Sequence, residues 1–144
     1  MIVDWEALAD NFEQASADQE SFLDLRTGSI VGWSSEMEGL VEVGELRRAV
    51  AAEPQRYARI EGPSPAVLKE WMEEFALKEG AGVEGALLLG ALDGTRGLRS
   101  FRIGLQDLPE LRDRWRALER RRVREAVRAW LAVLGLQPEN PPPW

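Results

Sequence analysis

The chain has 144 residues, about the size of one domain, and its 44% hydrophobic and 30% charged residues are typical of a globular protein. It contains neither Cys nor His, which excludes disulfides, thiol catalysis, Cys/His zinc sites and every Ser-His or Cys-His triad. Acidic residues outnumber basic ones by 25 to 18, giving a net charge of −7. We therefore expect no cofactor and no metal site.

The N-terminal third predicts a helix followed by a hairpin. Asp4 can cap a helix whose apolar residues recur at helical spacing: Trp5, Leu8, Ala9, Phe12 and Ala15. The segments 21–25 and 30–33 have the pattern of strands, and the turn between them, 26–29, contains Gly28.

The next segments predict a completed sheet. Leu40 to Val43 can begin another strand before a short helix from Glu45 to Glu53, and Pro54 ends that helix. Residues 56–60 are again strand-like. We therefore expect a small antiparallel sheet of about three strands, with helices covering one face.

The second half predicts helices. Ser64 and Pro65 form a typical helix opening, and further helices are expected over about 83–92, around Phe101, and from Pro109 to about Leu134. The last residues, 138–144, are rich in proline and favour an extended tail. The predicted class is therefore α+β, with a single domain over residues 1–137 and the tail 138–144.

Several local patterns, in this order, resemble one protein family. They are Leu23-Asp24-Leu25 before Thr27-Gly28, Arg56-Tyr57 with Ile60, Trp71-Met72 with Phe75, Ala91-Leu92-Asp93-Gly94 with Gly97, Phe101 and Arg102, Pro109-Glu110-Leu111 with Trp115, and Trp130-Leu131. The chain resembles the uncharacterised bacterial protein family number 0158 of the UPF series. This resemblance supports the fold and implies no established activity.

One stretch could bind an anion. The loop after residue 90 is rich in glycine and leads into a helix whose N-terminus presents free backbone N–H groups. Arg96, Arg99 and Arg102 recur at every third residue and would spread over about a third of that helix. The alternative is an ordinary loop between helices, with solvated arginines, and this alternative is favoured.

Charge is unevenly distributed along the chain. Residues 1–80 carry 7 basic and 17 acidic side chains, whereas residues 81–144 carry 11 arginines and 8 acidic residues. Arg122 falls on the apolar stripe predicted for the long helix: Leu111, Trp115, Leu118, Ala126, Trp130 and Leu134. Either Arg122 pairs with a carboxylate from the acidic half, which we favour, or the stripe opens there onto a partner.

Trp144 stands behind three prolines. Because tryptophan is frequent at interface hot spots, we hypothesise that the tail contacts a second copy of the chain. The tryptophans on helical stripes are expected in the core.

A catalytic reading would depend on carboxylates, since His and Cys are absent. Asp24 and Asp93, both in the family pattern, are the candidates, although Asp24 can instead bond a turn or an arginine and Asp93 can cap a helix. We expect a non-catalytic cytoplasmic binding or regulatory module that acts through protein contacts. The alternatives are a phosphate- or RNA-binding protein that uses the arginine-bearing helices and, less favoured, a carboxylate-dependent enzyme. No membrane segment is expected.

Overall fold

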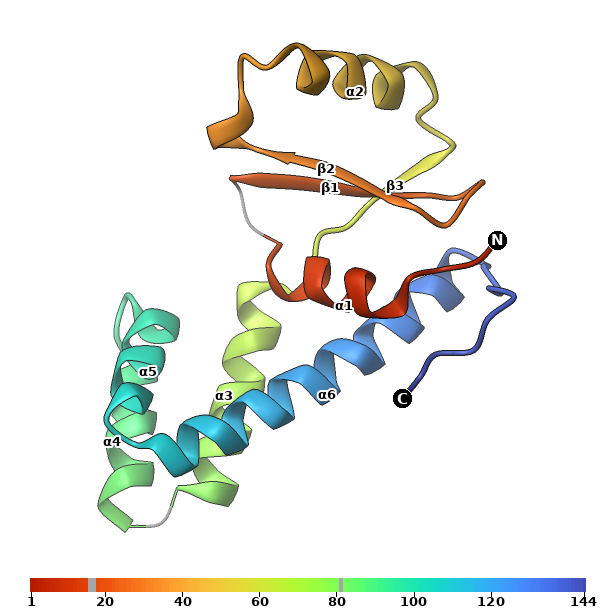
Figure 1. Ribbon diagram of the computed structural model, residues 1–144. Helices are drawn as coiled ribbons and strands as arrows, with labels where there is room; N and C mark the ends of the chain where they lie inside the picture. Colours follow the sequence, from red (N-terminus) through yellow and green to blue (C-terminus); the bar gives the residue numbers. More distant parts are fainter. Residues whose placement is uncertain (16–17, 81) are drawn as a thin grey trace. The chain divides into compact units, whose positions relative to one another are not determined.

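The computed structural model describes residues 1–15, 18–80 and 82–144, and these form two compact units. Unit 1 comprises residues 1–62 and 123–144, and unit 2 comprises residues 63–122. Helices predominate, and the described strands form one antiparallel sheet, so the predicted α+β class is confirmed (Figure 1). A single domain over residues 1–137 stays a prediction.

The sheet lies in unit 1. It consists of β1 (Gln19–Asp24), β2 (Ile30–Ser34) and β3 (Tyr57–Arg59), in the order β2-β1-β3. Phe22 of β1 stands opposite Val31 on one side and Arg59 on the other. The hairpin turn needs a glycine at residue 28, because its φ is +81° and an added Cβ would lie 2.0 Å from the carbonyl oxygen of Ile2.

Helix α1 (Trp5–Glu13) covers one face of this sheet in Figure 1. Asp4 caps it, because its carboxylate accepts the N–H of Ala7 at 3.0 Å. The buried face of α1 meets the C-terminal part of α6 (Pro109–Val133), where the rings of Phe12 and Trp130 lie 5.2 Å apart, edge to face. The core of unit 1 therefore joins the beginning of the chain to residues near its end.

The strand predicted from Leu40 to Val43 is wrong. A short 3₁₀ turn, η1 (Ser35–Met37), is followed after three further residues by helix α2 (Val41–Ala52). A run of four mixed residues does not distinguish a strand from the first turn of a helix, and here only Val43 is buried. The third strand is supplied instead by β3, as predicted from residues 56–60.

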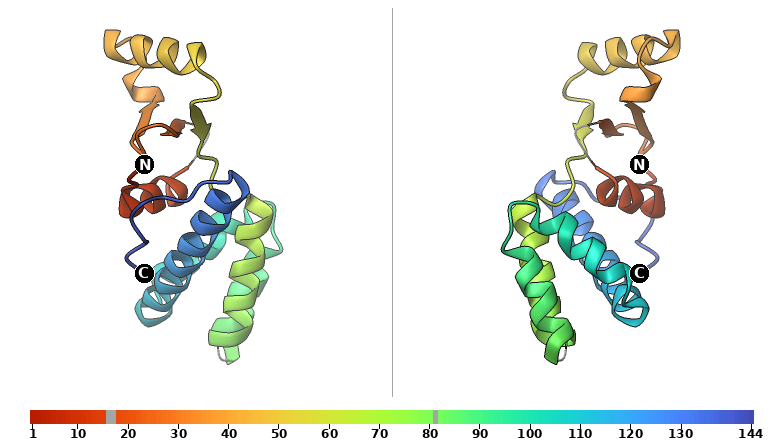
Figure 2. Two further views of the ribbon diagram at one scale, coloured as in Figure 1. Left: turned by 90° about the vertical axis from the view of Figure 1, so that its right-hand side faces the viewer. Right: turned by 90° about the vertical axis from the view of Figure 1, so that its left-hand side faces the viewer.

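Unit 2 is helical. It contains α3 (Pro65–Glu79), α4 (Gly82–Leu92), α5 (Gly97–Gln106) and residues 109–122 of α6. Figure 2 shows α3 and α4 running side by side. The buried core of the unit is formed by Met72, Phe75, Ala76, Leu88, Leu92, Phe101, Leu105, Leu111 and Trp115.

The apolar stripe of α6 was predicted correctly only in its first half. Leu111 and Trp115 are buried, but the later buried residues are Val123, Val127 and Leu131, and Leu134 is exposed. The buried residues continue in four-residue steps through Glu119, a position that a search for apolar residues passes over. None of the helices in the described ranges is both long and apolar enough to span a membrane.

Candidate functional site

Asp24, the last residue of β1, is buried and surrounded by donors. Its carboxylate accepts the backbone N–H groups of Arg26 and Thr27 at 2.9 and 3.3 Å. It also accepts Nε and Nη2 of Arg56 at 3.0 and 2.8 Å. The Arg56 guanidinium, helped by the turn N–H groups, holds the pKa of Asp24 well below its usual range. A carboxylate so fully engaged is a structural anchor and a poor general base.

Arg56 completes this cluster. Its Nη1 donates to Glu53 at 2.9 Å, and its guanidinium lies 5.2 Å from the centre of the Tyr57 ring. The two interactions predicted as alternatives for Asp24, with the turn and with an arginine, therefore both occur. Two of the patterns that carry the family resemblance, around Asp24 and at Arg56-Tyr57, thus meet in one place.

Asp93 lies in unit 2, exposed in the loop between α4 and α5. The structural role considered for Asp93, capping of a helix, does not occur at α5, because the N-cap of α5 is Arg96 and no side chain bonds there. Helix α5 begins at Gly97, four residues after Asp93, so Asp93 does not occupy its N-cap position. Within the described ranges, no group of three or more acidic side chains is placed to hold a metal ion.

Two of the three arginines of the predicted anion site line one hollow, and the third does not. Arg96 and Arg99 line a shallow hollow at the N-terminus of α5, together with Lys69 of α3. Arg102, one turn further along, donates to the buried carboxylate of Glu119 at 3.2 Å. Whether the hollow binds an anion stays a prediction.

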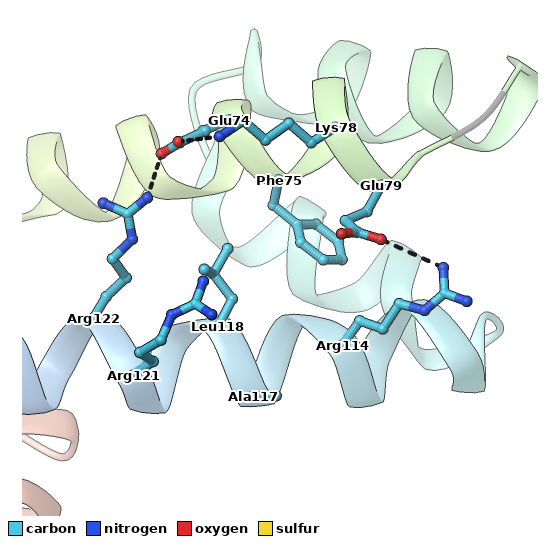
Figure 3. Close-up of a pocket in the computed structure, with 9 residues that line it drawn as sticks. All are labelled: Glu74, Phe75, Lys78, Glu79, Arg114, Ala117, Leu118, Arg121 and Arg122. Carbon is cyan, nitrogen blue, oxygen red and sulfur yellow. Dashed lines mark hydrogen bonds and ion pairs between the residues drawn. The ribbon is translucent and has the colours of Figure 1, made fainter. Parts of the chain in front are cut away.

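A groove lies between α3 and α6 within unit 2 (Figure 3). We call it the α3–α6 groove. Phe75, Ala117 and Leu118 supply its apolar part. Charged side chains form its rim, and they are Glu74, Lys78, Glu79, Arg114, Arg121 and Arg122.

Two ion pairs bridge the α3–α6 groove. Arg122 donates to Glu74 at 2.8 Å, and Arg114 donates to Glu79 at 3.4 Å (Figure 3). The favoured prediction for Arg122, a pair with the acidic half of the chain, is therefore confirmed. Its side chain is 30% exposed, so this pair stands at the edge of the helix interface and not in the core.

The rim retains a positive surplus. Four cations stand against two carboxylates, and Glu74 accepts from Lys78 at 2.8 Å as well as from Arg122. These partners, Lys78 first, lower the pKa of Glu74, so it stays ionised. Among the described residues, Arg121 has neither an ion pair nor a hydrogen bond through its side chain. This groove was not predicted from the sequence. The one feature of the sequence that pointed to it was Arg122, a charged residue on the predicted apolar stripe of the long helix.

Trp144 packs on its own chain, within unit 1. Its ring meets Trp5 edge to face at 5.8 Å, and the guanidinium of Arg124 lies 4.8 Å from its centre. Arg128 donates to its carbonyl oxygen. The tail is further held by Asn140, whose side-chain amide pairs with the backbone of Val3. The hypothesis that the tail contacts a second copy stays a prediction.

Comparison with known families agrees with the resemblance. The model of an uncharacterised protein family, UPF0158, matches residues 1–140. The chain therefore belongs to the uncharacterised protein family UPF0158, and the expectation from the sequence is confirmed. No curated protein and no solved structure matches the chain.

Proposed function

We propose that the chain is a non-catalytic, cytoplasmic binding or regulatory module that acts through protein contacts, and that the α3–α6 groove is its contact surface. The observation that carries this proposal is the combination of an apolar floor with a charged rim at one site. Protein interfaces commonly have an apolar centre and a polar rim.

The pairing of the arginines also supports protein contact over nucleic-acid binding. Arg114 and Arg122 each pair with a glutamate of the acidic half, and so does Arg124, whose Nη2 lies 3.5 Å from Glu6. These three neutralised arginines therefore contribute little to a phosphate-binding surface, since such a surface requires unpaired positive charge.

Site-specific photo-crosslinking tests this proposal. A photoreactive residue replaces Ala117, which is exposed in the groove, and in a matched variant it replaces Ala129, which is exposed elsewhere on α6. Irradiation of cells should give adducts of defined protein mass from position 117 and none of these from position 129. Equal adducts at both positions, or none at position 117, would contradict a contact surface in the groove.

Anion binding is a second candidate function, because Arg96, Arg99 and Lys69 line one hollow. Labelled single-stranded RNA, followed by anisotropy at two salt concentrations, provides the test. Binding that weakens steeply with salt and is lost in Arg99→Glu, but kept in the exposed control Arg116→Glu, would favour this function. Unchanged binding in Arg99→Glu would remove the hollow as the site.

A further inference from the structure

Unit 1 exposes a segment that combines carboxylates with large apolar side chains. Residues 35–42 are exposed throughout, across η1 and the start of α2. Its apolar side chains, Met37, Leu40 and Val41, are 48%, 54% and 70% exposed. Its carboxylates belong to Glu36, Glu38 and Glu42, of which Glu38 forms an ion pair with Arg47 of α2. Clustered apolar side chains that remain exposed on a folded protein commonly mark an interaction site.

The α3–α6 groove has complementary properties. Its four cations exceed its carboxylates by two, and Arg121 is left without a charged partner among the described residues. Between these cations lie the apolar surfaces of Ala117 and Leu118. A ligand for this groove therefore needs both carboxylates and apolar side chains, and the segment 35–42 carries both.

We propose that the α3–α6 groove of one copy binds the segment 35–42 of a second copy of this chain. The inference rests on the proposed function, because it names the partner of the same groove. Charge complementarity supports it. The segment has no basic residue and three carboxylates, and two of these, Glu36 and Glu42, have no ion pair among the described residues, whereas the groove has a positive surplus.

The contact joins two different surfaces, so two copies either make it reciprocally, in a closed two-fold dimer, or repeat it head to tail. Head-to-tail contacts close into a ring only where the geometry allows it and otherwise extend into open chains. Because the charged groups stand at the rim and are exposed, the association should weaken as salt is added.

A synthetic peptide tests the groove directly. A fluorescently labelled peptide of residues 35–42 is titrated with the full-length protein, and anisotropy reports binding. We expect saturable binding that weakens with salt, and at least about tenfold weaker binding to Arg121→Glu, because an attractive charge becomes a repulsive one. The matched control is Arg120→Glu, which has the same charge change on the same helix but lies outside the groove. Lys78→Glu, at a second exposed rim position, should weaken binding in the same way.

Two altered peptides separate the contribution of the carboxylates to binding from that of the apolar side chains. Replacement of Glu36, Glu38 and Glu42 by Gln should remove the salt dependence and most of the binding, and Leu40→Ser should weaken binding without changing the salt dependence. Equal binding of all three peptides would overturn the proposal. So would equal binding to Arg120→Glu and Arg121→Glu, each checked for unaltered folding by circular dichroism.

Sedimentation velocity tests whether the full-length protein associates with a second copy of itself. The sedimentation coefficient of the wild type should rise with concentration, and that of Arg121→Glu should not. Mixing Arg121→Glu with Glu42→Arg should restore association, because the reversed charges attract. A peptide that binds while the full-length protein remains a monomer at every concentration would overturn the proposal. If neither peptide binding nor association occurs, but position 117 still crosslinks to another protein, this inference fails and the proposed function stands.

Discussion

Asp24 and Arg56 join the ends of two strands through a bidentate ion pair. Nε and Nη2 of Arg56 lie 3.0 and 2.8 Å from the two carboxylate oxygens of Asp24. Beside them, the N–H of Leu25 donates to the carbonyl of Arg56 at 2.8 Å. Since β3 has only three residues, this pair fixes the end of a short ladder.

Removing the arginine should therefore destabilise unit 1. Arg56→Met leaves the Asp24 carboxylate without its main partner, and we expect the free energy of unfolding to fall by several times the effect of a substitution at an exposed position of the same strand. Urea unfolding followed by circular dichroism measures the loss. Arg59→Met, at an exposed position of β3, is the matched control and should change stability by less than about 0.5 kcal/mol. Equal effects of the two substitutions would show that the ion pair contributes little.

The same pair predicts a dependence of stability on pH. The pKa of Asp24 is lower in the folded protein than the value of about 3.9 expected for an unfolded chain, so below about pH 5 the unfolded state binds more protons. The stabilisation by Asp24 is therefore complete above that range and is lost as the pH falls through it.

Urea midpoints between pH 6 and pH 3 would show this loss. Asp24→Asn should flatten the profile, whereas Asp93→Asn, at an exposed loop position, should leave it unchanged. A profile as steep in Asp24→Asn as in the wild type would assign the pH dependence to other carboxylates, such as Glu74.

Two glycines of unit 2 should respond to alanine in opposite directions. A Cβ at Gly97 would lie 2.4 Å from the backbone oxygen of Leu92, whereas a Cβ at Gly90, inside α4, would meet nothing within 4 Å. Gly97→Ala should therefore destabilise the protein by at least about 1 kcal/mol, because backbone must move. Gly90→Ala should stabilise it by up to about 1 kcal/mol, because alanine favours the helix. Thermal unfolding compares the two, and a shift of the same sign in both would contradict this.

Asn140 ties the tail to the N-terminus. Its Oδ1 accepts the N–H of Val3 at 2.9 Å, and its Nδ2 donates to the carbonyl of Val3 at 2.6 Å. Asn140→Ala removes both bonds and leaves two backbone groups unpaired, so we expect a loss of about 1–3 kcal/mol. Gln137→Ala, exposed in the same tail, is the control. Similar unfolding midpoints for the two variants would contradict a stabilising role for Asn140.

Local patterns predicted most elements, because each had its own signal. Asp4 and Ser64 mark helix starts, and Gly28 marks the hairpin. The segment at Leu40 lacked such a signal, and its few apolar residues fit a strand as well as a helix. In α6, the buried face was predicted wrongly after Trp115, because it continues through Glu119 and a glutamate is expected on the solvent-exposed face.

The site was less predictable than the fold. The place of Arg122 on an apolar stripe indicates that it needs a carboxylate partner. The sequence does not identify Glu74, 48 residues away, as that partner. The even spacing of Arg96, Arg99 and Arg102 suggested one surface, yet the buried Glu119 draws Arg102 elsewhere. Which carboxylate an arginine pairs with depends on which helices pack together, and a single sequence does not reveal this packing.

The division of the chain has a consequence for its synthesis. Unit 1 is interrupted by unit 2, since the chain leaves it after Gly62 and returns at Val123. When the ribosome has made α1 and the sheet, the residues that cover Trp5 and Phe12, including Trp130 and Trp144, do not yet exist. Unit 2 is one uninterrupted stretch of chain and can assemble first. The residues of α1 and the sheet are thus translated before those of unit 2 and reach their final packing after them.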